Sequence, residues 1–447
     1  MDGPSDDQIP ERELASARIA GWRERLRVSL WFVPGLMVAV VIALEQAAIT
    51  IDRREGGGGI PLVTFVDDTD SATAVLTTIA SSTLTFMGVV FSITIVALQL
   101  ASSQFSPRVL RTFLSDRMTQ VALGSFVATF VYALLVLRQV DPSADGEPFV
   151  PGLAVFVAVV LVLFTVAVFI AFVHHIVHSI RVVEIIESVA DETREAIEAN
   201  LPAEDADPGL QVDGDDDALG LGPVTGMVKI GGAARVLAGI EVDRLVELAR
   251  AHDATFVLTA RVGDFLPGGV PVLRVHGGST PDREDLERCL DLTDERTMYQ
   301  DVRFGLRQLV DIAVKALSPG INDPTTAGQA VDRIVDLLRR IGRRPVSPNA
   351  YHDADGTLRL LRPQPSWDDI VHLGLTEIRL YGAGSIQVAR RLSAAYEDLE
   401  ATVADRFPER VRVLHEERDR LVEGVARSFE DPADQALALR PDRIGLG

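Results

Sequence analysis

Four long apolar runs constrain the fold of this chain more than any other feature of its sequence. They cover residues 28–48, 72–101, 119–137 and 149–180. An α-helix needs roughly 20 apolar residues to cross the hydrocarbon core of a bilayer, and each run approaches or exceeds this length. The fourth run has no Asp, Glu, Lys or Arg and is longer than a membrane requires, so its end is expected to continue into the cytoplasm as a rigid helix. The sequence therefore predicts four transmembrane helices.

The composition is that of a chain with two unlike parts. Hydrophobic residues make up 47% of the 447 positions, yet 24% are charged. A membrane block joined to a polar block combines these fractions, whereas an ordinary soluble domain does not. The net charge of −21 argues against nucleic-acid binding, which requires a basic surface. Cys289 is the single cysteine, so neither an intramolecular disulfide nor a cysteine-based metal site is expected, and no cofactor is predicted.

The positions of the arginines predict the orientation of the four helices. Cytoplasmic loops close to transmembrane helices are enriched in Arg and Lys. One side of the predicted membrane domain has Arg53, Arg54 and Arg138. The other side has more, before the first run and between the second and third: Arg18, Arg23, Arg25, Arg27, Arg108, Arg111 and Arg117. Both termini are therefore predicted to be cytoplasmic.

The two loops predicted to face outward are acidic. Their carboxylates are Asp67, Asp68, Asp70, Asp141, Asp145 and Glu147. Such loops would raise the local concentration of cations at an entrance, which makes a small cation a partner suggested by charge. A simpler interpretation stays open, in which outer loops merely lack Arg and Lys.

The second apolar run carries a stripe of small and hydroxylated residues. Its members are Thr78, Ser81, Thr85, Gly88, Ser92 and, after a gap at Ile95, Gln99. Steps of three and four residues keep them on one helix face. Such a stripe either lines water or packs closely against another helix, because small residues let backbones approach. Four helices make a thin bundle, so a hydrophilic path would form more easily between the copies of a homo-oligomer.

Ionisable groups within the runs are rare. The stripe itself has none, which argues against a proton relay or a strongly coupled pump. Glu45 is about one turn from the outer end of the first run and is interpreted as interfacial. In the fourth run, His174 and His178 are one helical turn apart, a spacing that can bind zinc. No further ligand pattern accompanies them, so they are only weak candidates and no metal site is predicted.

The chain divides into five segments. Residues 1–27 are predicted to be a cytoplasmic N-terminal segment, and residues 28–180 the transmembrane domain. Residues 181–222 extend the fourth helix and then form an acidic linker rich in Pro, Gly and Asp. Residues 223–280 alternate strand-like and turn-like stretches, which indicates a small α/β module. Residues 281–447 have apolar positions at helical spacing. The predicted fold is an α-helical integral membrane protein, with four transmembrane helices followed by a cytoplasmic α/β module and a helical bundle.

The stretch ALSPGINDPTTA, residues 316–327, separates two helices of this bundle. Its Ser-Pro-Gly segment is expected to end the first helix, with Gly320 in the left-handed position past the end. Asp323 and Pro324 are expected to begin the second helix as N-cap and first residue. A ligand or interface role stays open beside this structural one. The candidate corner or ligand loop consists of Ser318, Gly320, Asn322, Asp323, Thr325 and Thr326.

Three runs of this sequence resemble a known family. They are SSTLTFMGVVFSITIVALQLASSQFSPRVLRTFLSD, LGSFVATFVYALLVL and LRQLVDIAVKALSPGINDPTTA. Together with FVHHI in the fourth run, they look like an uncharacterised prokaryotic family of predicted membrane proteins, domain of unknown function 2254. The resemblance spans nearly the whole chain. It implies a multi-pass protein of the plasma (inner) membrane with a cytoplasmic domain, and it brings no accepted activity or catalytic residues.

Three functions compete on these observations. The first is an oligomeric channel or passive transport protein, in which the stripe lines the path and the cytoplasmic domain assembles or gates it. The alternative is a membrane-anchored regulatory or scaffolding protein whose soluble half binds a partner. An enzyme is the least supported, because the sequence contains no P-loop, G-x-S-x-G, H-E-x-x-H or cysteine-based metal pattern. The expected partners are the lipid bilayer, further copies of the chain and a small cation.

Overall fold

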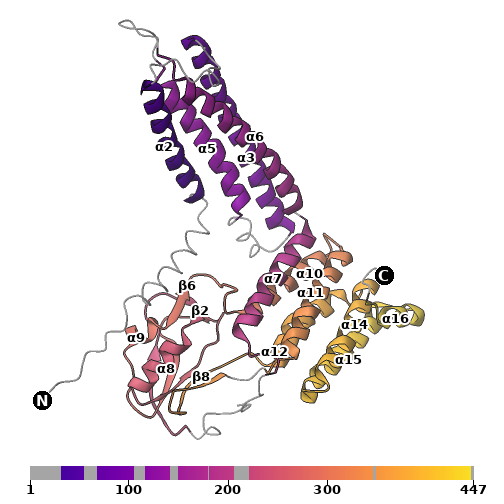
Figure 1. Ribbon diagram of the computed structural model, residues 1–447. Helices are drawn as coiled ribbons and strands as arrows, with labels where there is room; N and C mark the ends of the chain where they lie inside the picture. The colour runs from indigo at the N-terminus through magenta and orange to yellow at the C-terminus, as the bar shows by residue number, and fades with distance from the viewer. Residues whose placement is uncertain are drawn as a thin grey trace, which may run out of the picture. The chain divides into compact units, whose positions relative to one another are not determined.

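The computed structural model describes residues 32–54, 68–104, 116–140, 149–179, 181–205, 221–345 and 349–443. The chain forms two compact units, Met1–Arg181 and Val182–Gly447 (Figure 1). This division falls one residue after the predicted end of the transmembrane domain. The predicted N-terminal segment and most of the acidic linker, residues 206–220, lie outside the described residues.

Long helices make up the described part of the first unit. Their bounds are α2 (Phe32–Arg54), α3 (Thr69–Gln104), α5 (Arg117–Leu137) and α6 (Gly152–Ser179). Each of the four is long and apolar enough to cross a membrane. The four predicted helices are thereby confirmed as helices, although α2 ends at Arg54 rather than at residue 48.

Helix α5 is the centre of this bundle. It contacts the three other helices and lies between α2 and α3 (Figure 1). Small residues on α5 allow this close packing, since a Cβ atom added at Gly124 would lie 2.6 Å from the sulfur of Met37 on α2. Polar groups inside the bundle bond between helices: the hydroxyl oxygens of Thr129 and Thr165 are 2.8 Å apart and buried. Most of α5 is buried, whereas α2, α3 and α6 leave much of their surface uncovered.

The second unit contains two sheets. Their strands are β1 (Val224–Lys229), β2 (Arg235–Ile240), β3 (Thr255–Leu258), β4 (Phe265–Leu266), β5 (Pro271–His276), β6 (Leu290–Thr293), β7 (Asn349–His352) and β8 (Leu358–Arg362). One sheet has the order β1-β5-β3-β8-β7 and the other β4-β2-β6. Strands β3 and β5 pair antiparallel, with Thr255 opposite His276. Strand β8 lies parallel to β3, with Phe256 opposite Leu360.

The prediction that the chain is purely helical from residue 281 onward is wrong. Strands β6, β7 and β8 all lie beyond that position. Strands β7 and β8 complete the sheet that the α/β segment begins, so residues distant in sequence share one hydrophobic core. Their sequence signal was weak because each is short, and a short apolar run does not distinguish a strand from a helix.

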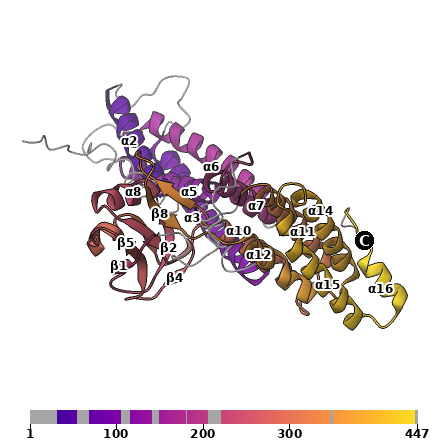
Figure 2. The same cartoon turned by 90° about the horizontal axis from the view of Figure 1, so that it is seen from below.

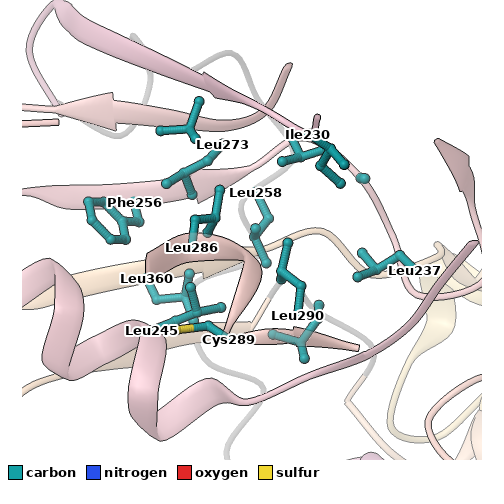
Figure 3. Close-up of a cluster of buried hydrophobic side chains, with 14 of the residues drawn as sticks. Ile230, Leu237, Leu245, Phe256, Leu258, Leu273, Leu286, Cys289, Leu290 and Leu360 are labelled. Carbon is teal, nitrogen blue, oxygen red and sulfur yellow. The ribbon is translucent and has the colours of Figure 1, made fainter. Parts of the chain in front are cut away.

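Buried side chains from residues 223–280 and from the segment beyond residue 280 together fill the sheet core (Figure 3). Helices α8 (Val242–Ala251) and α9 (Arg283–Glu287) contribute Leu245 and Leu286, which are fully buried. Cys289 lies in the same cluster. Burial raises the pKa of its thiol to about 11, so the group is protonated at neutral pH and poorly reactive.

The remaining helices of the second unit pack around one another (Figure 2). They are α7 (Val182–Asn200), α10 (Val302–Ala316), α11 (Pro324–Gly342), α12 (Trp367–Val371), the π-helix η3 (His372–Thr376), α13 (Glu377–Gly382), α14 (Ile386–Val403), the 3-10 helix η4 (Pro408–Arg410), α15 (Val411–Ser428) and α16 (Pro432–Leu439). Helix α7 contacts α10 and α11, and α11 contacts α14. The predicted extension of the fourth run is thus a separate helix, α7, built into this unit.

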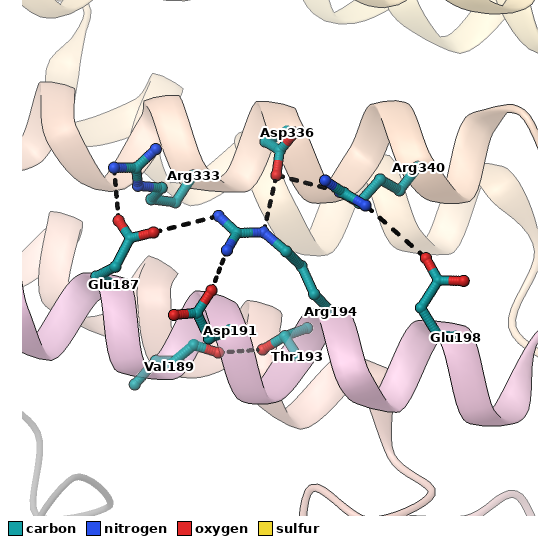
Figure 4. Close-up of polar contacts among 9 residues, drawn as sticks. All are labelled: Glu187, Val189, Asp191, Thr193, Arg194, Glu198, Arg333, Asp336 and Arg340. Atoms are coloured by element: carbon teal, nitrogen blue, oxygen red, sulfur yellow. Dashed lines mark hydrogen bonds and ion pairs between the residues drawn. The ribbon is translucent and has the colours of Figure 1, made fainter.

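Ion pairs join α7 to α11 along their shared side (Figure 4). The guanidinium of Arg194 contacts Glu187, Asp191 and, with a 3.1 Å hydrogen bond from Nε, Asp336 of α11. Arg340 donates to the same Asp336 carboxylate at 3.3 Å. Burial alone would raise the pKa of Asp336, but the hydrogen bonds and charges of Arg194 and Arg340 lower it below its ordinary value.

Replacing Leu286 by Ala tests the sheet core. We expect the variant to lose about 2–5 kcal/mol of unfolding free energy, because a fully buried Leu leaves a cavity when it is truncated. Denaturant unfolding of the purified chain measures this loss. Val224→Ala, at a side chain 40% exposed on β1, is the matched control and should change stability by less than about 0.5 kcal/mol. Equal losses in the two variants would contradict the assigned core.

Stability at acid pH tests the Arg194–Asp336 contact. A carboxyl group with a lowered folded-state pKa stabilises the fold above its unfolded pKa of about 3.9, and this stabilisation is lost as the pH falls through the folded-state value. We expect the thermal midpoint of the wild type to fall more steeply below about pH 5 than that of Arg194→Gln. Arg427→Gln, whose Arg pairs only with an exposed Glu423 at 3.9 Å, should follow the wild-type curve. Parallel curves for wild type and Arg194→Gln would contradict the assignment.

Candidate functional site

The stripe on α3 points away from the helix bundle. All six of its residues are exposed in the chain: Thr78, Ser81, Thr85, Gly88, Ser92 and Gln99. The buried residues of α3, among them Leu76 and Val90, lie on the opposite side, roughly 180° away at 100° per residue. A Cβ atom added at Gly88 would meet no atom within 4 Å. In the described part of the bundle, the stripe therefore packs against no helix of its own chain, and both interpretations, contact with water and packing against a helix of another copy, stay predictions.

The hydroxyl groups of three stripe residues, Thr78, Ser81 and Thr85, donate to the backbone of α3 itself. Thr78 Oγ1 donates to the carbonyl of Ala74 at 2.7 Å, and Thr85 Oγ1 to that of Ser81 at 2.9 Å. Ser81 Oγ donates to the carbonyl of Thr77 at 2.8 Å. Each of these hydroxyls donates its proton to a carbonyl of α3, so its oxygen can act only as an acceptor toward other groups. The stripe thus presents hydrogen-bond acceptors to whatever covers it.

Glu45, interpreted from the sequence as interfacial, is buried between the helices of the bundle. Only 1% of its surface is exposed, and it is nine residues before the end of α2 because this helix continues to Arg54. Its carboxylate accepts a 2.8 Å hydrogen bond from the amide of Gln46. Helical spacing offered the missing signal, since Val41, Glu45 and Ala48 follow one another by four and three residues on the buried face of α2.

Asp52 has a structural role in the bundle that the sequence analysis did not predict. Its side chain is 3% exposed and caps the first turn of another helix, α6. The two carboxylate oxygens accept hydrogen bonds from the backbone N–H groups of Leu153 at 3.0 Å and Ala154 at 3.1 Å. These groups have no partner inside their own helix, and the positive end of the helix dipole favours a carboxylate there. An acid from α2 thereby holds the start of α6.

The histidines of α6 do not converge on a metal site in the described part of the chain. His174 is exposed, and the side chain of His178 lies outside the described residues. The neighbouring His175 contacts Asp116, the N-cap of α5, at 3.1 Å. Among the described residues, no group of three His, Cys, Asp or Glu side chains is close enough to hold a metal ion.

The corner between α10 and α11 has the predicted cap but a different left-handed residue. Asp323 is the N-cap of α11 and accepts from the backbone N–H of Thr326 at 3.0 Å, with Pro324 as the first residue. The left-handed position is taken by Asn322, with φ of 50°, and not by Gly320 as expected. Asn tolerates this conformation better than other side chains that have a Cβ atom.

The polar side chains of the corner form hydrogen bonds with residues that neighbour them in the sequence. Ser318 Oγ donates to the carbonyl of Lys315 at 2.6 Å, and Thr326 Oγ1 donates to Asp323 at 2.6 Å. Thr325 is exposed. The hydrogen bonds of this stretch therefore account for much of its composition as a turn.

Of the acids predicted in the outer loops, the structure describes Asp68 and Asp70, while Asp67, Asp141, Asp145 and Glu147 lie outside the described residues. Asp68 precedes the first turn of α3 and accepts from the backbone N–H of Ser71 at 2.6 Å and from its hydroxyl at 2.7 Å. These hydrogen bonds lower the pKa of Asp68 below its ordinary value. The carboxylate is therefore ionised at neutral pH, at the start of the helix that carries the stripe.

These features define a class of protein: four helices of membrane-crossing length, followed by a unit of mixed sheets and helices. The chain belongs to the family described as predicted membrane protein (DUF2254), whose model matches residues 27–398. An uncharacterized protein of Mycobacterium bovis and one of Mycobacterium tuberculosis are each 32% identical to it over 421 residues. The match covers 93% of this chain and 79% of each relative. No solved structure matches the chain significantly.

Replacing Asp52 by Asn tests the cap on α6. The amide keeps one acceptor oxygen and places an N–H₂ donor against a backbone N–H donor, so we expect a loss of about 1–3 kcal/mol of unfolding free energy. The thermal midpoint of the detergent-solubilised protein reports this loss. Asp70→Asn makes the same chemical change at an exposed position and should have a clearly smaller effect. An unchanged midpoint for Asp52→Asn would show that the cap does not stabilise the bundle.

Proposed function

We propose that this protein is an oligomeric, channel-like protein that lets small cations pass passively through the plasma membrane of a prokaryote. The observation that carries the proposal is the outward direction of the α3 stripe. In a single copy, six small or polar positions would face lipid tails, an environment that provides them with no hydrogen-bond partners. Bringing the stripes of several copies together around a symmetry axis would remove them from lipid and give them water to bond.

The chemistry of the stripe favours cations among small solutes. The hydroxyls of Thr78, Ser81 and Thr85 donate their protons to carbonyls of α3, which leaves their oxygen lone pairs as the groups that can bond a solute. Oxygen acceptors replace the hydration water of a cation, whereas an anion needs donors. Asp68 and Asp70 at the start of α3 add negative charge at the end that we assign to the outer side, from the arginine distribution of the sequence. In this orientation both termini and the second unit are cytoplasmic, where the second unit would assemble or gate the path.

The alternative function is a membrane-anchored regulatory or scaffolding protein. It is favoured by Leu380 and Tyr381, adjacent residues of α13 that are 63% and 58% exposed. Exposed large apolar side chains of this kind are suited to binding a partner protein. No enzymatic role is part of either proposal.

Cation flux into proteoliposomes tests the channel proposal. We expect wild-type protein to conduct, and Ser92→Phe to reduce flux by about tenfold or more, because the added ring fills the path between the stripes. Ile170→Phe is the matched control: Ile170 is 65% exposed on α6, so the same bulk is added at an apolar position away from the stripe. Absence of wild-type flux over a wide range of voltage, pH and osmotic tension would reject the channel and favour the scaffold.

Cysteine crosslinking separates a blocked path from a lost assembly. In a Cys289→Ser background, Ser92→Cys places the single thiol on the stripe. An oxidant should then link two copies, because facing stripes bring the two thiols within reach of a disulfide bond. Ile170→Cys in the same background should give no dimer. Equal crosslinking at both positions would mean that the stripe is not the contact between copies.

A further inference from the structure

A small cavity in the second unit contains a buried positive charge that the proposed function does not use. The cavity has a volume of about 30 Å³ and lies where four segments of the unit meet. These are the end of α7, the turn after β3, the start of α10 and the stretch between β8 and α12. Its polar lining includes Arg261, Gln300, Asp301, Arg303, Arg362 and Gln364.

Arg362 is the unusual member of this lining. It is the last residue of β8 and is 6% exposed. No hydrogen bond or ion pair found among the described residues involves its guanidinium group, and the guanidinium nitrogens are not among the fully buried atoms that lack a partner. Arginines as buried as Arg362 are normally paired with a carboxylate or a carbonyl, so the missing protein partner is unusual.

The other charges around the cavity are already matched. Arg261 pairs with Asp369 at 3.3 Å, and Arg303 pairs with Asp264 at 3.3 Å. Asp301 is held at 2.8 Å by Arg296, which is outside the cavity. Among the residues that line the cavity, no carboxylate is therefore left over to neutralise Arg362. The cavity keeps an excess of one positive charge.

A second donor without a partner lines the same cavity. The side-chain nitrogen Nε2 of Gln364 is buried and has no hydrogen-bond partner. Gln364 lies between Pro363 and Pro365, whose fixed backbone angles restrict the segment. By contrast, both polar atoms of the Gln300 amide have partners. Its oxygen accepts from the backbone N–H of Ile240, and its nitrogen donates to the carbonyl of the same residue. Arg362 and Gln364 thus bring two donor groups to the lining of one cavity, and the described residues supply no hydrogen-bond partner for the buried Nε2 of Gln364.

We infer that this cavity is a binding site for a small oxyanion group, a phosphate or a carboxylate. A guanidinium and an amide N–H₂ can only donate, so their missing partner must supply oxygen acceptors. A guanidinium binds the paired oxygens of a carboxylate or phosphate with two parallel hydrogen bonds. Holding one water takes roughly 10–15 Å³, so the cavity has room for about two such oxygens and excludes a nucleotide base. The site stands independently of the proposed channel.

Calorimetric titration of the purified full-length chain tests this site. Inorganic phosphate, acetate and glycerol 3-phosphate are titrated separately, at constant ionic strength in a buffer without other oxyanions. We expect saturable binding of phosphate or acetate to one site per chain. Glycerol 3-phosphate shows which phosphate the site takes. If it binds as tightly as inorganic phosphate, the site accepts a phosphomonoester headgroup. If it binds much more weakly, the site is specific for free phosphate.

Variants of the two donors decide whether binding occurs in this cavity. Arg362→Gln should weaken binding by about tenfold or more, and Arg362→Lys by less, since Lys keeps the charge but not the paired donors. Gln364→Leu should weaken it by a smaller factor. Arg250→Gln, which removes an exposed positive charge on α8, should bind like the wild type.

Thermal stability provides a readout that does not depend on measuring heat of binding. The midpoint of the wild type should rise with phosphate or acetate concentration, and that of Arg362→Gln should not. In a buffer without oxyanions, Arg362→Gln should be at least as stable as the wild type, because it removes an unpaired buried charge. The inference is overturned if none of the three probes binds, if Arg362→Gln binds as tightly as the wild type, or if Arg362→Gln is destabilised without oxyanions.

Discussion

Polar groups that leave water must find partners inside the protein, and both units of this chain are organised by that requirement. In the first unit, the carboxylate of Asp52 accepts from two backbone N–H groups of α6, and the hydroxyls of Thr129 and Thr165 bond to each other. Without these contacts the groups would be unsatisfied in a low-dielectric interior, which costs more than a hydrogen bond contributes. The same requirement makes the outward stripe of α3 informative.

The two units satisfy their buried polar groups with different kinds of side chain. The helices of the first unit are so apolar that few polar side chains have to be satisfied, and hydroxyls donate to the carbonyls of their own helix. The second unit contains many arginines, and nearly every buried one has a carboxylate or a carbonyl beside it. Arg379 donates to the fully buried Glu417 at 2.8 Å, and Arg410 donates to the carbonyl of Gly342 at 2.8 Å. Arg362 departs from this pattern, and we therefore assign a ligand to it.

The predictions made from the sequence succeeded where a property repeats along the chain. A run of about 20 mainly apolar residues that crosses a bilayer satisfies its backbone groups within a helix, so the four helices of the first unit were found. The cap at Asp323 was found because it depends only on neighbouring residues. Strands β7 and β8 were missed, since they are stabilised by pairing with each other and with β3, almost a hundred positions earlier. Gly320 was assigned the conformation that Asn322 adopts, because either residue type is compatible with it.

The sequence by itself determined that one face of α3 is small and polar, because helical periodicity places residues three and four apart on one side. Only the tertiary structure decided that this face points away from the bundle, since the direction depends on which face of α3 packs against α5. The burial of Glu45 and the cap by Asp52 depended on the tertiary structure in the same way, because their neighbours come from other helices. The unpaired charge of Arg362 became visible only when four distant segments were brought around one cavity.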